Sequence, residues 1–333
     1  MGSRKFKIIS LAVLVILILS VSALSGFYYY VTNVPSVSED KIIDIPRGKG
    51  VRKISALLED EGVIRDGNLF VAYVIVKGWK DKLKAGEYQF KKGSTIADVA
   101  LKIAWGDVLV HKVTIPEGLT VKDIAALLDK NGVLDGKRFL AESADPKLLE
   151  SLPGRHVTGI EGHLFPDTYT YTKGVTPEKF ILMMVERFDK VYTSLGGLKN
   201  RVNLTDNEII TLASIIEKET GAASERPLVS AVFHNRLKLG MKLDSDPTVI
   251  YGLGEGFDGK LTRDDLNTMT QYNTYVIKGL PPGPICNPGK ESIIAAMSPA
   301  PVDYLYFVSR GDGTHYFSDN YEDHQRAVSE YQR

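Results

Sequence analysis

Two glutamates near the end of an apolar segment are the side chains best placed for acid–base chemistry. Glu217 and Glu219 follow residues 209–216, a run of mostly aliphatic and small side chains. Burial among apolar groups raises the pKa of a carboxyl group because it disfavours the charged form, and a raised pKa suits a proton donor near neutral pH. The segment therefore indicates a general acid, and spacing alone does not decide which glutamate it is.

The same segment predicts the helix that holds these acids. Thr205 and Glu208 have the spacing of a capping box, which marks a helix start. Gly221 is a plausible stop, so the helix is expected over about residues 206–220. Two positions apart on an α-helix, the acids point about 200° away from each other and cannot flank one bond as a pair. For Glu217 the alternative is an ordinary ion pair with Lys218, Arg226 or Arg236.

Composition excludes several classes of function. With 333 residues the chain is long enough for two or three domains, and its 41 basic and 41 acidic side chains cancel, so no nucleic-acid partner is predicted. Cys286 is the one cysteine, which excludes an internal disulfide. The six histidines show no metal-ligand spacing, so neither a metal nor another cofactor is expected.

The first residues predict a membrane anchor. Basic residues within 4–7 precede an uncharged, mostly aliphatic run over 8–32, which is long enough to span a bilayer. Aromatic residues 27–30 are typical of the far membrane interface. We expect residues 1–7 in the cytoplasm, one transmembrane helix over 8–32 in the cell (inner) membrane, and the rest outside the cytoplasm. A cleaved signal peptide is the alternative, with a poor cleavage site at 21–23.

An internal repeat follows a short polar linker at 35–40. Ile45-Pro46-Arg47-Gly48 recurs seventy positions later as Ile115-Pro116-Glu117-Gly118, and matching apolar positions follow both copies without a gap. Each copy predicts a short strand, a turn and an amphipathic helix. This pattern resembles small sugar-binding modules of the LysM type, so we expect an α+β module over 41–142 that binds glycan. A purely structural repeat is the alternative.

The character of the chain changes at about residue 145. Segments 161–169 and 279–285 are dense in aromatic, glycine and proline residues, and turn-rich backbone beside predicted helices often carries binding loops. We therefore predict a second domain over 145–333, with a mixed α+β fold.

Several segments, taken in order, resemble the endolytic murein transglycosylase family, the YceG-like proteins. The segments are Glu161-Gly-His-Leu-Phe-Pro-Asp-Thr-Tyr169, Leu212-Ala-Ser-Ile-Ile-Glu-Lys-Glu-Thr220, Val232-Phe-His-Asn-Arg-Leu237, 241–251, Tyr272-Asn-Thr-Tyr275, 279–288 and 304–307. The resemblance implies a single-pass membrane protein, with a LysM-like module and a catalytic domain, that cuts peptidoglycan glycan strands internally. It places the catalytic acid on Glu217. It also implies a role in ending strand elongation beside peptidoglycan synthases.

The implied chemistry needs one carboxyl group. A lytic transglycosylase protonates the leaving glycosidic oxygen between MurNAc and GlcNAc, and the 6-hydroxyl of the same muramyl sugar closes onto C1 as a 1,6-anhydro ring. The acid, now a base, takes the proton from that hydroxyl. Ordinary glycosidases need a second carboxylate.

Three polar residues are candidates for binding the sugar under this mechanism. Asp246 is predicted to stabilise positive charge at the anomeric carbon, and a turn before Pro247 is its alternative role. Asn273 and Tyr275 are predicted to hydrogen-bond or stack against acetamido sugars, and loop packing is the alternative.

Three further residues are candidates for substrate binding with a stronger structural alternative. Glu161 and Asp167 bracket a Leu-Phe-Pro turn, where structural hydrogen bonding is expected. Arg236 is a candidate for binding a peptide-stem carboxylate, although pairing with an acid of the chain itself is expected.

Two rival functions stay open at this point. A muramidase would use water, with Asp246 as the second carboxylate, and would leave ordinary reducing ends. A non-catalytic scaffold would hold glycan through the repeats, and its cellular function would survive replacement of Glu217 by Gln.

Overall fold

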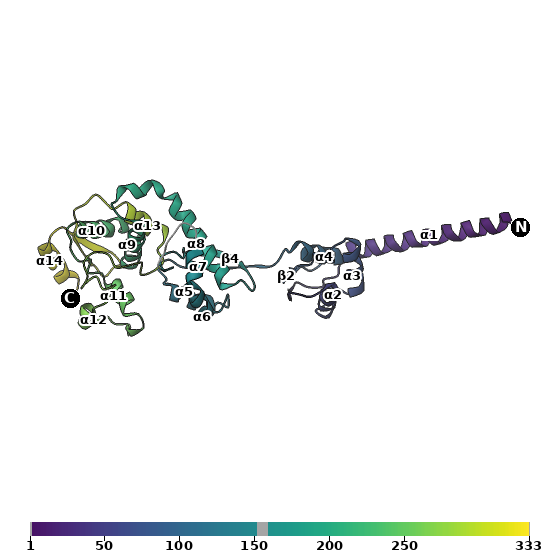
Figure 1. The fold of residues 1–333 in the computed structure, drawn as a ribbon, viewed down its shortest axis with the longest axis horizontal. Helices are drawn as coiled ribbons and strands as arrows, with labels where there is room; N and C mark the ends of the chain where they lie inside the picture. The colour runs from purple at the N-terminus through teal and green to yellow at the C-terminus, as the bar shows by residue number, and fades with distance from the viewer. Residues whose placement is uncertain (1, 152–158, 333) are drawn as a thin grey trace. The chain divides into compact units, whose positions relative to one another are not determined.

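The computed structural model describes residues 2–151 and 159–332, which form two compact units (Figure 1). The first unit comprises Met1–His111 and Thr170–Lys173, and the second comprises Lys112–Tyr169 and Gly174–Arg333. Helices and two-stranded sheets occur together, which confirms the α+β class. The division differs from the predicted modules, because the second copy of the repeat belongs to the second unit. Its turn is bonded there: the Gly118 N–H donates to the Asn287 carbonyl at 3.0 Å.

The N-terminal helix α1 (Gly2–Asn33) contains the predicted membrane span. Residues Lys5–Asn33 have a mean hydropathy of 2.8, and among the described residues this is the one helix long and apolar enough to cross a membrane. Its last turns pack on the first unit, where Val31 is fully buried. The expected linker at 35–40 is not free, because the N–H groups of Ser36 and Val37 both donate to the Ser94 carbonyl.

The first unit is a small α+β body. Strands β1 (Lys41–Ile45) and β2 (Gly86–Phe90) pair antiparallel with Ile43 opposite Tyr88. Three helices cover this two-stranded sheet and bury its apolar side chains: α2 (Val51–Asp60), α3 (Gly67–Val76) and α4 (Ile96–Trp105).

The remaining elements are mostly helical. The strands are β3 (Val110–Thr114) paired with β4 (Thr168–Thr172), and β5 (Tyr306–Ser309) paired with β6 (His315–Ser318). The helices are α5 (Val121–Lys130), α6 (Gly136–Ser143), α7 (Pro146–Ser151), α8 (Pro177–Ser194), α9 (Asp206–Glu219), α10 (Arg226–Lys238), α11 (Asp246–Leu253), α12 (Arg263–Asn267), α13 (Lys290–Met297) and α14 (Tyr321–Tyr331). Two 3₁₀ turns lie at Gly196–Arg201 and Gly254–Gly256.

Helix α9 is the central element of the second unit. Its capping box is formed as predicted, because Thr205 Oγ1 accepts from the Glu208 N–H and Glu208 Oε2 accepts from the Thr205 N–H. Residues 209–216 are all buried, and α10, α11 and α13 pack around them (Figure 1). The helix ends at Glu219, one residue before the predicted end, because Thr220 is extended.

Thr205→Ala removes the capping hydroxyl and should lower the free energy of unfolding by about 1 kcal/mol. Urea denaturation followed by circular dichroism measures this change. Thr193→Ala, at an exposed position in α8, is the matched control and should change stability by less than about 0.5 kcal/mol. Equal effects of the two substitutions on the free energy of unfolding would show that the capping hydroxyl does not stabilise the helix.

Candidate active site

The two acids at the end of α9 have different surroundings, as their spacing requires. Glu217 is enclosed: its side chain is 7% exposed, and its Oε2 accepts from the Gly289 N–H at 2.9 Å. Its Oε1 lies 3.6 Å from Nη2 of Arg226. The ion pair with Arg226, which was the alternative to catalysis, is therefore present.

The contacts of Glu217 join three parts of the second unit. Gly289 is the N-cap of α13, so the carboxylate lies at a helix N-terminus, where negative charge is favourable. Nη2 of Arg226 also lies 3.9 Å from the carboxylate of Glu117 in the second repeat, and its Nε donates to Ser292 at 3.1 Å. Burial, and then the charge of Glu217, raises the pKa of Glu117. In the described chain, Glu217 has no bond to any other residue predicted for the site.

Glu219 faces a cavity of about 430 Å³. Its carboxylate accepts a hydrogen bond from the hydroxyl of Ser245, which is itself buried. The pKa of Glu219 is raised to about 7, chiefly by burial; the charge of Asp246 adds to the rise, while the Ser245 hydrogen bond and Arg236 act against it. Glu219 therefore has the properties that the sequence predicted for the acid.

Asp246 and Tyr275 lie on the wall of the same cavity. The Tyr275 hydroxyl donates to Asp246 Oδ1 at 2.7 Å, and Asp246 is the first residue of α11. Asp246 is exposed, which leaves its carboxylate accessible to a ligand. The structure thus brings two of the predicted sugar-binding residues to Glu219.

A strained segment places Ser245 against the acid. Asp244 has φ of 48°, an unusual value for a residue other than glycine. The next N–H, that of Ser245, donates to Thr274 Oγ1 at 3.0 Å, and the Asp244 N–H donates to the Thr274 carbonyl. Such strain persists where the surroundings hold it, often at functional sites. Sequence reasoning missed Ser245, although it directly precedes the predicted site residue Asp246.

Arg236 serves the structure of this cavity. Its side chain is buried and donates to the carbonyls of Leu305 (2.7 Å) and Leu243 (2.8 Å). Its Nη1 lies 3.1 Å from Asp244 Oδ2, so the expected pairing with an acid is present. The guanidinium also lies over the Tyr306 ring, 5.3 Å from its centre.

Asn273 does not reach the cavity. It is fully buried, and its amide nitrogen donates to the carbonyls of Leu266 (3.1 Å) and Thr268 (2.8 Å). Its side-chain oxygen accepts from the Tyr275 N–H at 2.9 Å. These hydrogen bonds within the loop use the polar atoms of the Asn273 side chain. They favour loop packing, the alternative role of Asn273, over sugar binding.

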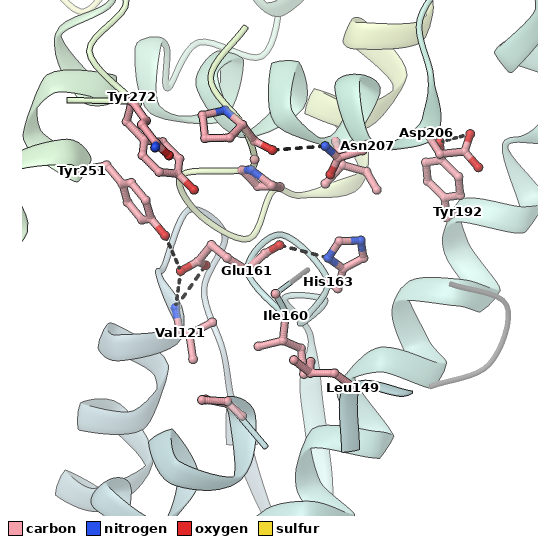
Figure 2. Close-up of a pocket in the computed structure, with 18 of the residues that line it drawn as sticks. Val121, Leu149, Ile160, Glu161, His163, Tyr192, Asp206, Asn207, Tyr251 and Tyr272 are labelled. Atoms are coloured by element: carbon pink, nitrogen blue, oxygen red, sulfur yellow. Dashed lines mark hydrogen bonds between the residues drawn. The ribbon is translucent and has the colours of Figure 1, made fainter. Parts of the chain in front are cut away.

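Asp167 and Glu161 also lie away from Glu219. Asp167 forms an ion pair with Nε of Arg187 at 2.6 Å, the structural role that was expected. Glu161 lines a second, larger cavity of about 1060 Å³ (Figure 2). Its carboxylate accepts from the amide of Asn287 at 2.9 Å and from the Val121 N–H at 3.1 Å. Burial raises its pKa to about 7.

Figure 2 shows aromatic rings on one side of this larger cavity. Tyr251 and Tyr272 lie 4.8 Å apart between ring centres, and the Tyr251 hydroxyl points to Glu161. On the other side, the ring of His163 bonds the Glu161 carbonyl and packs on Phe188. Rings and buried polar groups suit a sugar-sized ligand, although this cavity does not include Glu217 or Glu219.

Comparison with known proteins decides the family. A model described as the YceG-like family matches residues 43–330. The chain belongs to the YceG-like family.

Two relatives of this YceG-like chain are both named endolytic murein transglycosylase. An endolytic murein transglycosylase of Streptococcus pneumoniae is 32% identical over 94% of the chain, and one of Bacillus subtilis is 31% identical over 87%. The chain spans 63% of the length of the first and 84% of the second. The crystal structure of a YceG-like protein from Listeria monocytogenes is similar with a TM-score of 0.59 and 34% identity, over 87% of this chain and 99% of that one.

The buried carboxyl of Glu161 should make stability depend on pH. Its folded pKa of about 7 exceeds the ordinary 4.5, so between these values the native state binds more protons than the unfolded state. Stability from this group is therefore complete below about pH 4.5 and is lost as the pH rises through about 7, by up to about 3 kcal/mol.

Glu161→Gln should flatten the fall in the free energy of unfolding across this window. Denaturant titrations at several pH values measure how the free energy of unfolding changes with pH. The same titrations of Glu219→Gln measure how much of this change comes from Glu219, another carboxyl group with a raised pKa. A slope unchanged by Glu161→Gln would contradict the raised pKa.

Proposed function

We propose that this YceG-like protein is an endolytic peptidoglycan lytic transglycosylase, a lyase that cuts MurNAc–GlcNAc bonds within nascent glycan strands and leaves 1,6-anhydro-MurNAc ends. The names of the relatives support the reaction. The observation that carries the proposal is Glu219, a carboxyl group with a pKa of about 7 on the wall of a cavity. Near neutral pH such a group is protonated in part of the molecules and can both give and take a proton.

We assign the acid to Glu219 rather than to Glu217. Glu217 is held by Arg226 and by the Gly289 N–H, and it does not line the cavity. Glu219 shares its cavity with Asp246 and Tyr275. One residue separates the two glutamates in the sequence motif, so the motif alone does not distinguish them as the catalytic acid.

In the proposed reaction Glu219 protonates the leaving glycosidic oxygen while the muramyl 6-hydroxyl attacks C1. The carboxylate of Asp246 lies in the same cavity and is positioned to stabilise positive charge at the anomeric carbon, with Tyr275 fixing its orientation. Having lost its proton, Glu219 is a base within the cavity. No second nucleophile from the protein is required, because the substrate supplies it.

The N-terminal helix and the repeats indicate where in the cell the proposed activity takes place. We propose that α1 spans the cell (inner) membrane with its N-terminus in the cytoplasm, and that the LysM-like repeats hold glycan. The end of α1 packs on the rest of the first unit, so no free linker separates the proposed anchor from that unit, and we propose that cutting takes place near the membrane. There the enzyme would end strand elongation beside the synthases that polymerise the glycan.

Replacing each acid separately tests the assignment. Full-length protein in detergent is incubated with purified peptidoglycan, and the fragments are analysed by mass spectrometry. Glu219→Gln should lower the rate of release of 1,6-anhydro fragments by at least about 10²-fold. Glu217→Gln, the matched control on the same helix, keeps an acceptor for Gly289 and should retain most of the activity with lower thermal stability.

The products decide between the reactions. Reducing ends that carry one added water would make the protein a muramidase, with Asp246 as the second carboxylate. Loss of activity in Glu217→Gln but not in Glu219→Gln would return the acid to Glu217. Absence of glutamate-dependent cleavage from the wild type would leave the glycan-binding scaffold as the function.

A further inference from the structure

A buried carboxylate–histidine pair lies beside the Glu219 cavity. His315 is the first residue of β6, and its Nδ1 lies 2.7 Å from Oε2 of Glu225. The His315 N–H donates to the other carboxylate oxygen of Glu225 at 2.9 Å. Glu225 is 8% exposed and directly precedes α10. Its carboxylate therefore contacts both the backbone N–H and the ring of His315.

The pair fixes which nitrogen of the imidazole is available. A carboxylate that accepts from Nδ1–H holds the ring in the tautomer whose Nε2 carries a lone pair. The His315 ring lines the cavity, and in the described chain no protein group bonds its Nε2. Phe307 packs edge-on against the ring with centres 5.4 Å apart, which limits its rotation.

Other groups in the cavity are committed to different partners. Asp244 pairs with Arg236, and Asp246 accepts from Tyr275. His324 also lines the cavity, but it stacks on Tyr306 and no carboxylate of the described chain orients it. His315 is therefore the imidazole in this cavity whose orientation is set by a buried acid.

We propose that His315 is a second catalytic residue of the proposed transglycosylase reaction, accepting the proton of the muramyl 6-hydroxyl at Nε2. The inference rests on the proposed function. As the O6–C1 bond forms and the bond from C1 to the leaving oxygen breaks, that oxygen takes the proton of Glu219 and Nε2 takes the proton of O6. Transfer of this proton from His315 to the Glu219 carboxylate, directly or through water, restores both groups.

This division of labour separates two tasks that one carboxyl group would otherwise perform in sequence. Glu219 donates while His315 accepts, so bond breaking and ring closure can occur in one step. The arrangement is the acid–base analogue of an imidazole oriented by a carboxylate in nucleophilic catalysis. Glu225 acts through His315 and is a positioning residue.

Two substitutions at position 315 separate catalysis from structure. In His315→Asn the amide nitrogen can take the place of Nδ1 and keep the bond to Glu225, while Nε2 is lost. In His315→Gln the amide extends toward the position of Nε2, but neither amide accepts a proton near neutral pH. Glu225→Gln keeps a hydrogen-bonding partner for the ring and removes its charge. Each variant is prepared as the full chain, and its thermal unfolding and its kcat and KM on purified peptidoglycan are measured.

The proposal expects His315→Asn to unfold near the wild-type temperature, to retain the wild-type KM and to lose about 10²-fold in kcat. The residual activity would come from Glu219 acting alone. His315→Gln should lose as much in kcat, and Glu225→Gln should lose less. Wild-type kcat in His315→Asn, with loss confined to His315→Gln, would show that the bond to Glu225 is structural and overturn the proposal.

Failure of the proposed function gives a different result. If the wild type releases no 1,6-anhydro fragments, the transglycosylase reaction itself is wrong, and the inference fails with it. If the wild type and His315→Asn release them at the same rate while Glu219→Gln does not, the function stands and the role of His315 is rejected. A rise in KM with unchanged kcat would assign His315 to binding and would also overturn the proposal.

Discussion

Everything at the candidate site depends on the burial of α9. Residues 209–216 are enclosed by neighbouring helices, so charged side chains are tolerated only at the ends of the helix. There the helical geometry sends the two glutamates in different directions. Glu217 meets Arg226 and the N-terminus of α13, which satisfies its charge, and Glu219 meets Ser245 and a cavity. One acid therefore holds the helix in place and the other is left with an unusual pKa.

The cavity is built from segments that are distant in sequence. Arg236 on α10 donates to the carbonyl groups of Leu243 and Leu305, and thereby links the strained turn at Asp244 to the segment that leads into β5. This turn places the hydroxyl of Ser245 against the carboxylate of Glu219. Backbone strain at Asp244 is offset by the ion pair with Arg236 and by the hydrogen bonds that the Asp244 and Ser245 N–H groups donate to Thr274. The acid is consequently held by segments that are far apart in the sequence.

Local signals in the sequence predicted the elements, and tertiary contacts decided the roles. The capping box at Thr205, an N-terminal helix long and apolar enough to cross a membrane, and the α+β class followed from spacing and composition, and all three are confirmed. The choice between Glu217 and Glu219 depends on Arg226 and Ser245, whose positions no periodicity reveals. Likewise the linker at 35–40 has a polar composition, yet its backbone is bonded to Ser94 from a distant turn. The pairing of His315 with Glu225 joins residues ninety positions apart, which no local pattern in the sequence reveals.

Titration of the Glu219 carboxyl group tests the central claim most directly. Infrared difference spectra of the wild type against Glu219→Gln, recorded from about pH 4 to about pH 9, isolate the protonated carboxyl band of this residue. The account predicts that the band disappears with a midpoint at about 7. A midpoint near the ordinary 4.5 would mean that Glu219 is ionised at neutral pH and cannot supply the proton, which would contradict the account.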